Sequence, residues 1–252
     1  MSLVADAPVD ALLCDADGCL FPSEEPAFEA SAEVTNEFLA ELGGSRRFSG
    51  EELRLATTGK NFRTTAAALA AAEGSTVAPE MLERWVEAER QAVTAHLSEA
   101  LLPDPFVIEP LSRLAASHTL AVVSSSAAAR VGSCLRATGL DGLFPARLRF
   151  SAENSLPVPT SKPDPAIYLH ALAEVGIAST RALAVEDSVP GAQAAVAAGC
   201  RTIGNVMFVP AAERARRVTE LKRAGVVEVV SSWEDLELLL ESVEPGLAAV
   251  GR

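Results

Sequence analysis

Side chains that bind metals, attack electrophiles or bind anions gather at four places in the sequence. Asp15 and Asp17 stand in Asp-Ala-Asp-Gly, directly after a short apolar run. Ser124-Ser125-Ser126 follow a second apolar run, and Glu186-Asp187 follow a third. Lys162 lies in Ser-Lys-Pro-Asp-Pro, just ahead of a predicted helix. Polar groups of complementary chemistry therefore recur at equivalent positions, where an apolar run ends or a helix begins.

Together these groups could carry out the transfer of a phosphoryl group. Carboxylates such as Asp15 and Asp187 are hard oxygen ligands of the kind that Mg²⁺ prefers. A carboxylate can also attack phosphorus and form a covalent intermediate. A second carboxyl group, that of Asp17, could protonate the leaving oxygen and later activate water. Serine hydroxyls and a lysine would supply hydrogen bonds and positive charge to the phosphoryl oxygens.

The apolar runs have the pattern of strands that are buried on both faces. They cover residues 11–14, 120–123, 182–185, 202–203 and 226–230. Their hydrophobicity is continuous rather than alternating, which is typical of a parallel sheet. Helical stretches lie between or beside them, and this alternation predicts an α/β fold with a Rossmann-like parallel sheet. Ligands of such sheets bind at the carboxyl ends of the strands, where the polar groups are expected.

The segment from about residue 26 to residue 99 differs because it contains helical signals and no convincing strand. Ser49 with Glu52 three residues later predicts a capping box at a helix start. Residues 62–72 are rich in alanine and predict a further helix, and Pro79 suits the first turn of another. The segment is therefore predicted to be entirely helical.

Two prolines mark the return to the α/β pattern. Pro103 and Pro105 are expected to break the chain before the second strand. We therefore predict two domains: a catalytic core of residues 1–21 and 103–252, and an inserted all-helical domain of residues 22–102.

The four motifs, in this order, resemble those of the haloacid dehalogenase superfamily. The motifs that carry the resemblance are Asp-Ala-Asp-Gly-Cys-Leu, Val-Val-Ser-Ser-Ser, Ser-Lys-Pro-Asp-Pro and Val-Glu-Asp-Ser-Val-Pro-Gly. It spans nearly the whole chain. The helical insert after the first motif is similar to the cap domain of the phosphatase and β-phosphoglucomutase branch. The resemblance thus implies a catalytic core with an inserted helical cap.

This resemblance implies a catalytic and metal-binding role for the acidic residues. Asp15 would be the nucleophile and Asp17 the general acid and base. Asp15, the main-chain carbonyl of Asp17 and Asp187 would hold Mg²⁺. Glu186 would assist there, directly or through water.

The resemblance also implies which residues bind the substrate. Ser124 and Lys162 would bind the phosphoryl group, with help from the Ser125 backbone. The part of the cap that faces the active site in similar enzymes includes Lys60 and Arg63, so we expect one of them to contact the substrate.

Two residues depart from the family's usual pattern after the nucleophile. Cys19 replaces the usual Thr or Val, and Pro22 replaces a second Asp. The fixed φ angle of Pro22 should stiffen the path to the cap. The departures therefore bear on cap motion and leave the chemistry intact.

Asp17 favours a phosphate ester over other substrates of the superfamily. The dehalogenases that the chain resembles lack an Asp two residues after the nucleophile, and phosphonoacetaldehyde hydrolases generally carry alanine there. We expect a phosphatase that hydrolyses a small phosphate monoester, such as a sugar phosphate or a similar metabolite. A β-phosphoglucomutase-like phosphomutase shares all four motifs and remains an alternative.

A non-catalytic phospho-acceptor module, similar to a response-regulator receiver, is a third interpretation. Receivers also place Asp, an acidic pair, Ser or Thr and Lys around Mg²⁺. Their acidic pair follows the first strand and their phosphorylated Asp a later one, so the motif order here disfavours this interpretation.

The composition excludes several other classes of protein. A net charge of -13 argues against a nucleic-acid partner. No apolar run reaches the roughly 18 residues of a membrane span, and Met1–Val9 has no Lys or Arg to begin a signal peptide. The cysteines form no C-x-x-C pair, so we expect free thiols, no zinc site and a reducing, cytoplasmic location. The sequence indicates no particular oligomeric state.

Overall fold

The computed structural model describes residues 8–57 and 62–250, which form two compact units. The first unit ends at Pro22 and resumes at Leu102, and the second is Ser23–Leu101. The first contains the sheet, and the described residues of the second contain helices only. The second unit's role as a cap remains a prediction.

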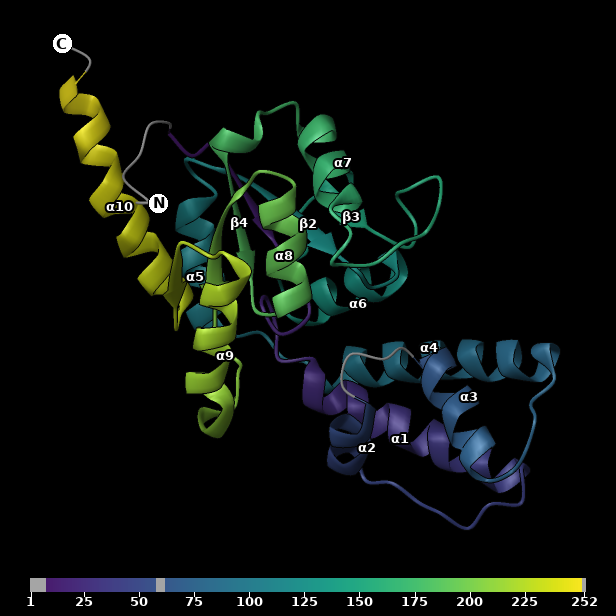
Figure 1. Ribbon diagram of the computed structural model, residues 1–252. Coiled ribbons are helices and arrows are strands. Elements are labelled where there is room, and N and C mark those ends of the chain that lie inside the picture. Colours follow the sequence, from purple (N-terminus) through teal and green to yellow (C-terminus); the bar gives the residue numbers. More distant parts are fainter. Residues whose placement is uncertain (1–7, 58–61, 251–252) are drawn as a thin grey trace. The chain divides into compact units, whose positions relative to one another are not determined.

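Six parallel strands form one sheet in the first unit, in the order β3-β2-β1-β4-β5-β6 (Figure 1). The strands are β1 (Ala11–Cys14), β2 (Thr119–Ser124), β3 (Arg149–Ser151), β4 (Ala182–Glu186), β5 (Arg201–Asn205) and β6 (Glu228–Val230). The predicted α/β class is thereby confirmed. Strand β3 was not predicted from the sequence, because its three residues, Arg-Phe-Ser, include only one apolar side chain.

Helices cover both faces of the sheet (Figure 1). On one face lie α7 (Ala166–Val175), α8 (Val189–Ala197) and α9 (Ala211–Ala224), and on the other α5 (Pro105–Leu114), α6 (Ala128–Ala137) and α10 (Trp233–Val250). The chain extends the sheet first from β1 to β3 and then, in the opposite direction, from β4 to β6. Right-handed crossovers therefore place the two sets of helices on opposite faces. Two single 3₁₀ turns, Ala146–Leu148 and Ser179–Arg181, precede β3 and β4.

Pro105 begins a helix, whereas the sequence analysis expected it to break the chain. Asp104 is the N-cap of α5, and its Oδ1 accepts a hydrogen bond from the Phe106 N–H at 2.9 Å. Proline is well suited to the first helical position because its missing N–H would have no intrahelical partner there. The Pro-Asp-Pro segment therefore lies near the start of the returning part of the first unit and begins its first helix.

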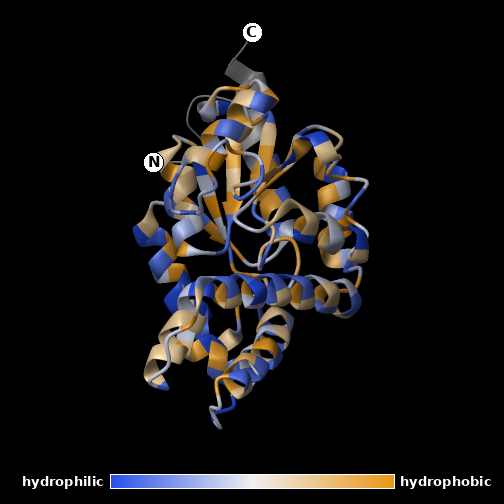
Figure 2. Ribbon diagram, turned by 90° about the vertical axis from the view of Figure 1, so that its right-hand side faces the viewer, coloured by the Kyte–Doolittle hydropathy of each residue, from blue (hydrophilic) through white to orange (hydrophobic). Residues whose placement is uncertain are grey.

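The central strands β1, β2 and β4 are mostly apolar because both faces of the sheet are covered. In β1 every residue is buried, and Leu13 packs with Val123 of β2, Ala184 of β4 and Ile167 of α7 in one cluster. Figure 2 shows mostly hydrophobic colours along the strands, whereas the helices mix hydrophobic and hydrophilic residues. A sheet covered on both faces offers only its strand ends to a ligand.

The second unit consists of α1 (Glu24–Glu41), α2 (Gly50–Thr57), α3 (Phe62–Ala72) and α4 (Pro79–Ala100) in its described residues. The predicted capping box is confirmed. Ser49 Oγ accepts a hydrogen bond from the Glu52 N–H at 3.2 Å, and Glu52 Oε2 accepts one from the Ser49 N–H at 2.8 Å. Phe38, Leu39 and Leu53 lie in the buried core of this unit.

None of the helices in the described part of the chain combines the length and hydrophobicity needed to span a bilayer.

Candidate active site

Three carboxylates meet at the carboxyl ends of β1 and β4. Asp15 follows β1, Glu186 is the last residue of β4, and Asp187 comes next. One oxygen from each lies within 4.8 Å of the others, and all three residues are buried. The two strands are parallel neighbours with Cys14 opposite Val185, so they end at the same level. Strand register thus brings together acidic groups that lie about 170 residues apart in the sequence.

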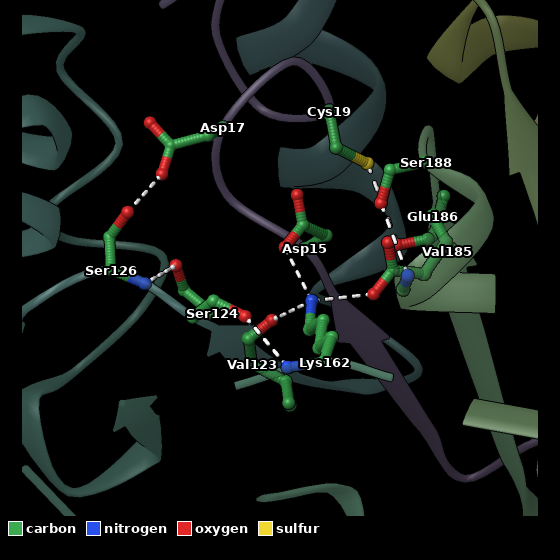
Figure 3. A network of polar contacts seen from close by, with 12 residues as sticks. Asp15, Asp17, Cys19, Val123, Ser124, Ser126, Lys162, Val185, Glu186 and Ser188 are labelled. Carbon is green, nitrogen blue, oxygen red and sulfur yellow. Dashed lines mark hydrogen bonds and ion pairs between the residues drawn. The ribbon is translucent and has the colours of Figure 1, made fainter. Parts of the chain in front are cut away.

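The ammonium group of Lys162 lies between two of these carboxylates (Figure 3). Its Nζ is 2.5 Å from Asp15 Oδ1 and 2.5 Å from Glu186 Oε1. It also donates to the main-chain oxygen of Val123 at 2.8 Å. The hydroxyl of Tyr168 donates to the same Glu186 oxygen at 2.5 Å. Lys162 is therefore fixed by three acceptors, those of Asp15, Val123 and Glu186, rather than extending into solvent.

Burial raises the pKa of Asp15 to about 7, because the charged form loses hydration there; Lys162 opposes this shift and Glu186 adds to it. Burial also raises the pKa of Asp187, and the charges of Asp15 and Glu186 raise it further against the opposing Arg217. Burial alone would lower the pKa of Lys162, but the two carboxylates outweigh it and raise that pKa. Negative charge in the cluster thus exceeds what its cations neutralise.

The cluster has the properties of a site for a divalent cation. Among the described residues, Glu186 Oε2 is buried without a hydrogen-bond partner, which is costly for an oxygen that carries charge. Three buried carboxylates provide hard oxygen donors, and a cation among them would favour their ionised forms. The donor set therefore fits Mg²⁺, although other divalent ions share this preference for oxygen.

Two glycines leave room for the acidic side chains. Gly18 has a positive φ of 76°, and a methyl group there would lie 2.5 Å from Asp187 Oδ2. At Gly191, in the first turn of α8, a methyl group would lie 1.8 Å from Glu186 Oε2. Glycine lets the backbone approach both carboxylates more closely than any other residue would.

Asp17 points away from Asp15 and Glu186 and toward the segment that follows β2 (Figure 3). The Ser126 hydroxyl donates to Asp17 Oδ2 at 2.6 Å, and Arg130 Nη2 donates to Oδ1 at 3.1 Å. The side chain of Asp17 is thus separate from the cluster to which its main-chain carbonyl was predicted to contribute.

The predicted phosphate-binding serines lie at the end of β2, next to β1 in the sheet. Ser124 is buried, and its Oγ accepts a hydrogen bond from the Ser126 N–H at 3.0 Å. The Oγ of Ser125 accepts one from the Lys162 N–H at 3.1 Å. The second of these bonds links the second motif to the main chain of the third.

The two predicted substrate residues of the helical unit have different positions in the structure. Arg63, in α3, forms a two-pronged ion pair with Glu83 of α4 within the same unit. Lys60 lies outside the described residues. The prediction of a substrate contact stays untested for both.

Sequence reasoning missed four residues that contact the acidic groups. Arg130 and Tyr168 lie on helices that follow a motif, and Gly191 is inside the fourth motif but had no role assigned.

Arg217, in α9, donates from Nη1 to the Asp187 main-chain oxygen at 2.8 Å and lies 3.8 Å from Asp187 Oδ2. No pattern in the sequence distinguishes it from its arginine neighbours. Tyr168 could have been noticed, because it is the only tyrosine of the chain and follows Lys162 by six residues.

An open parallel sheet whose carboxyl edge holds an acidic cluster and a buried lysine defines an α/β enzyme with a polar site at its strand ends. The chain belongs to the haloacid dehalogenase-like hydrolases, whose family model matches residues 9–199. This confirms the predicted superfamily and the prediction that the chain is an enzyme. No curated protein matches the sequence.

Solved structures agree with the family assignment. A conserved haloacid dehalogenase-like protein of unknown function from Agrobacterium tumefaciens is 27% identical with a TM-score of 0.70, covering 94% of this chain and 99% of that one. A family hydrolase from Deinococcus radiodurans, solved with phosphate and sodium, is 26% identical (TM-score 0.67; 95% and 98% covered). CbbY from Rhodobacter sphaeroides, solved with xylulose 1,5-bisphosphate, is also 26% identical (TM-score 0.67; 89% and 95% covered).

The closeness of Gly191 to Glu186 predicts that Gly191→Ala disrupts the acidic cluster. Glu186 would have to move, and it would lose its bonds to Lys162 and Tyr168. We expect the affinity for Mg²⁺, measured by titration calorimetry, to fall by about tenfold or more. Gly142→Ala is the matched control, because no atom lies within 4 Å of a methyl group there. An unchanged affinity in Gly191→Ala would show that Glu186 does not depend on this glycine.

Proposed function

We propose that this protein is a Mg²⁺-dependent phosphatase that hydrolyses a small phosphate monoester through an aspartyl-phosphate on Asp15. The observation that carries the proposal is the position of Lys162, whose ammonium group contacts Asp15 Oδ1 inside a cluster of three buried carboxylates. A nucleophilic carboxylate beside a cation and a metal-binding cluster is the arrangement that attack on an anionic phosphoryl group requires.

The family and two similar structures support the substrate class. The hydrolase from D. radiodurans holds phosphate, and CbbY holds a sugar bisphosphate. A phosphorylated metabolite of similar size suits the present chain. We propose neither a nucleic acid nor a membrane as a partner, since a net charge of -13 disfavours binding to a polyanion.

The metal would be held by Asp15, the main-chain carbonyl of Asp17 and Asp187, with assistance from Glu186. A bound Mg²⁺ would neutralise charge on the carboxylates and on the phosphoryl oxygens, so that two anions can meet. Lys162 adds a second positive charge, and Ser124 with the Ser125 main chain would supply hydrogen bonds to the same oxygens.

In the first step, an oxygen of the Asp15 carboxylate attacks phosphorus and forms a new P–O bond. The bond between phosphorus and the ester oxygen breaks, and the electron pair stays on that oxygen. The Asp17 carboxyl group gives its proton to the leaving oxygen, so the product departs as a neutral alcohol.

In the second step, Asp17 takes a proton from a water molecule as the water oxygen attacks the phosphorus of the aspartyl-phosphate. The P–O bond to Asp15 breaks, which releases inorganic phosphate and restores the carboxylate. Asp17 is then protonated and ready for the next substrate. The net reaction consumes one ester and one water.

The phosphomutase alternative differs only in the acceptor of the second step. A hydroxyl group of a sugar phosphate, rather than water, would then receive the phosphoryl group from Asp15. The receiver-like alternative would stop after the first step. We favour hydrolysis because the family matched by residues 9–199 is one of hydrolases.

A substrate screen distinguishes the three functions. Sugar phosphates, nucleotides, phosphoglycolate and a generic aryl phosphate are incubated with the enzyme in Mg²⁺ or in EDTA, and released phosphate and isomeric products are both quantified. Phosphate release that requires the metal supports the phosphatase. Isomers without phosphate release would support the mutase, and neither product from any compound would support a phospho-acceptor module.

Asp15→Asn is expected to lower kcat by roughly a thousandfold or more. The amide is uncharged and cannot attack phosphorus as an anion. Asp141→Asn, at an exposed position, should keep normal activity, and circular dichroism should show both variants folded. A near-normal kcat in Asp15→Asn would remove Asp15 from its role as nucleophile.

Asp187→Ala is expected to raise the Mg²⁺ concentration for half-maximal activity by at least about tenfold. The variant loses a hard oxygen donor from the three-carboxylate cluster, while Asp15 stays in place. The measurement is a metal titration of activity, paired with calorimetric Mg²⁺ binding. A titration that matches the wild type would show that the ion binds elsewhere.

A further inference from the structure

The carboxylate of Asp17 has a separate hydrogen-bond donor on each oxygen. Ser126 Oγ donates to Oδ2 at 2.6 Å, and Arg130 Nη2 donates to Oδ1 at 3.1 Å. Arg130 lies in the first turn of α6, a short distance after the serines of the second motif. The side chains of Asp17 and Arg130 are 29% and 24% exposed, so solvent screens their ion pair only in part.

The segment that carries these donors is fixed by the last residue of β3 and by a residue shortly after it. Ser151 Oγ donates to the Ser126 main-chain oxygen at 2.8 Å. Asn154 Oδ1 accepts from the Ala128 N–H at 2.8 Å, which provides a cap that the N-cap residue Ala127 cannot offer. Both donors to Asp17 therefore lie on an anchored turn rather than on a free loop.

We propose that Arg130 is a positioning residue for Asp17, holding its carboxyl group in the plane from which it exchanges protons with the substrate and with water. The proposal rests on the function proposed above. Because Arg130 binds one oxygen and Ser126 the other, the two donors together restrict the rotation of the carboxyl group more than the hydroxyl alone can. When the Asp17 proton has passed to the ester oxygen and the P–O bond has broken, the carboxylate left behind is already paired with a cation.

This role makes the effect of Arg130 depend on the leaving group. A 4-nitrophenolate leaves readily without a proton, whereas a benzyl alcohol must be protonated as it leaves. Since kcat/KM reports the steps up to departure of the alcohol, a defect in proton donation lowers it for benzyl phosphate and spares 4-nitrophenyl phosphate. The two esters are similar in size, so a general distortion of the site would affect both.

The variants to compare are Arg130→Gln, Arg130→Lys and the control Arg136→Gln, which removes the same charge from an exposed position of the same helix. In Arg130→Gln we expect kcat/KM to fall by about 10- to 100-fold with benzyl phosphate and by less than about threefold with 4-nitrophenyl phosphate. Lysine at this position should restore part of the loss, and the control should match the wild type. Equal losses with both esters, or no loss, would overturn the proposal.

Combination with Asp17→Ala separates this proposal from the proposed function. If Arg130 acts through Asp17, Arg130→Gln should cause no further loss in the Asp17→Ala background. Full activity of Asp17→Ala with benzyl phosphate would overturn the role of Asp17 itself. Crystal structures of the wild type and Arg130→Gln give a test without turnover: the Asp17 side chain should adopt a different rotamer or several, and an unchanged orientation would overturn the positioning role.

Discussion

The contact of one buried ammonium group with two buried carboxylates is the interaction on which the site depends. Lys162 balances part of the charge of Asp15 and Glu186, and its own pKa is raised by them despite burial. Without this cation, three carboxylates at the end of a water-excluded sheet would tend to bind protons instead of carrying charge. Asp15 would then lose the anionic form that its proposed role as nucleophile needs. The pKa of Asp15 is still raised to about 7, so Lys162 only partly offsets the effect of burial on this carboxyl group.

The parallel sheet is what makes such a concentration of charge possible. β1, β2 and β4 are adjacent and in register, so the residues after each strand reach the same edge. These three strands are mostly apolar and are covered by helices on both faces, which leaves their carboxyl ends as the place where polar groups can gather. Gly18 and Gly191 then admit the carboxylates at distances that a Cβ atom would prevent. The parallel, in-register strands therefore determine both the fold of the sheet and the position of the acidic site at its carboxyl edge.

Most of this arrangement could be predicted from the sequence, and the exceptions have physical causes. The runs before Asp15 and Glu186 are continuous and apolar, so both strand ends were predictable from hydrophobicity alone. β3 was not, because an edge strand of three residues needs few apolar side chains. Arg217 was not predictable either, since its contact with Asp187 depends on how α9 packs against the sheet. Local sequence patterns predict helices and strands and where they end. Contacts between residues far apart in the sequence depend on how the helices pack, which a single sequence does not reveal.

The separation of Asp17 from the other acidic groups follows from the same charge balance. A fourth carboxylate in the cluster would add repulsion where Lys162 already neutralises too little. Asp17 instead points to the other side of the loop, where Ser126 and Arg130 bind its oxygens. In the proposed mechanism Asp17 both gives and takes a proton, which needs surroundings different from those of Asp15, the proposed nucleophile, which must stay charged. Asp15 and Asp17 are only two positions apart, yet the turn after β1 directs their carboxylates to different surroundings. Asp15 lies in the acidic cluster, whereas Asp17 is bound by donors from the segment after β2.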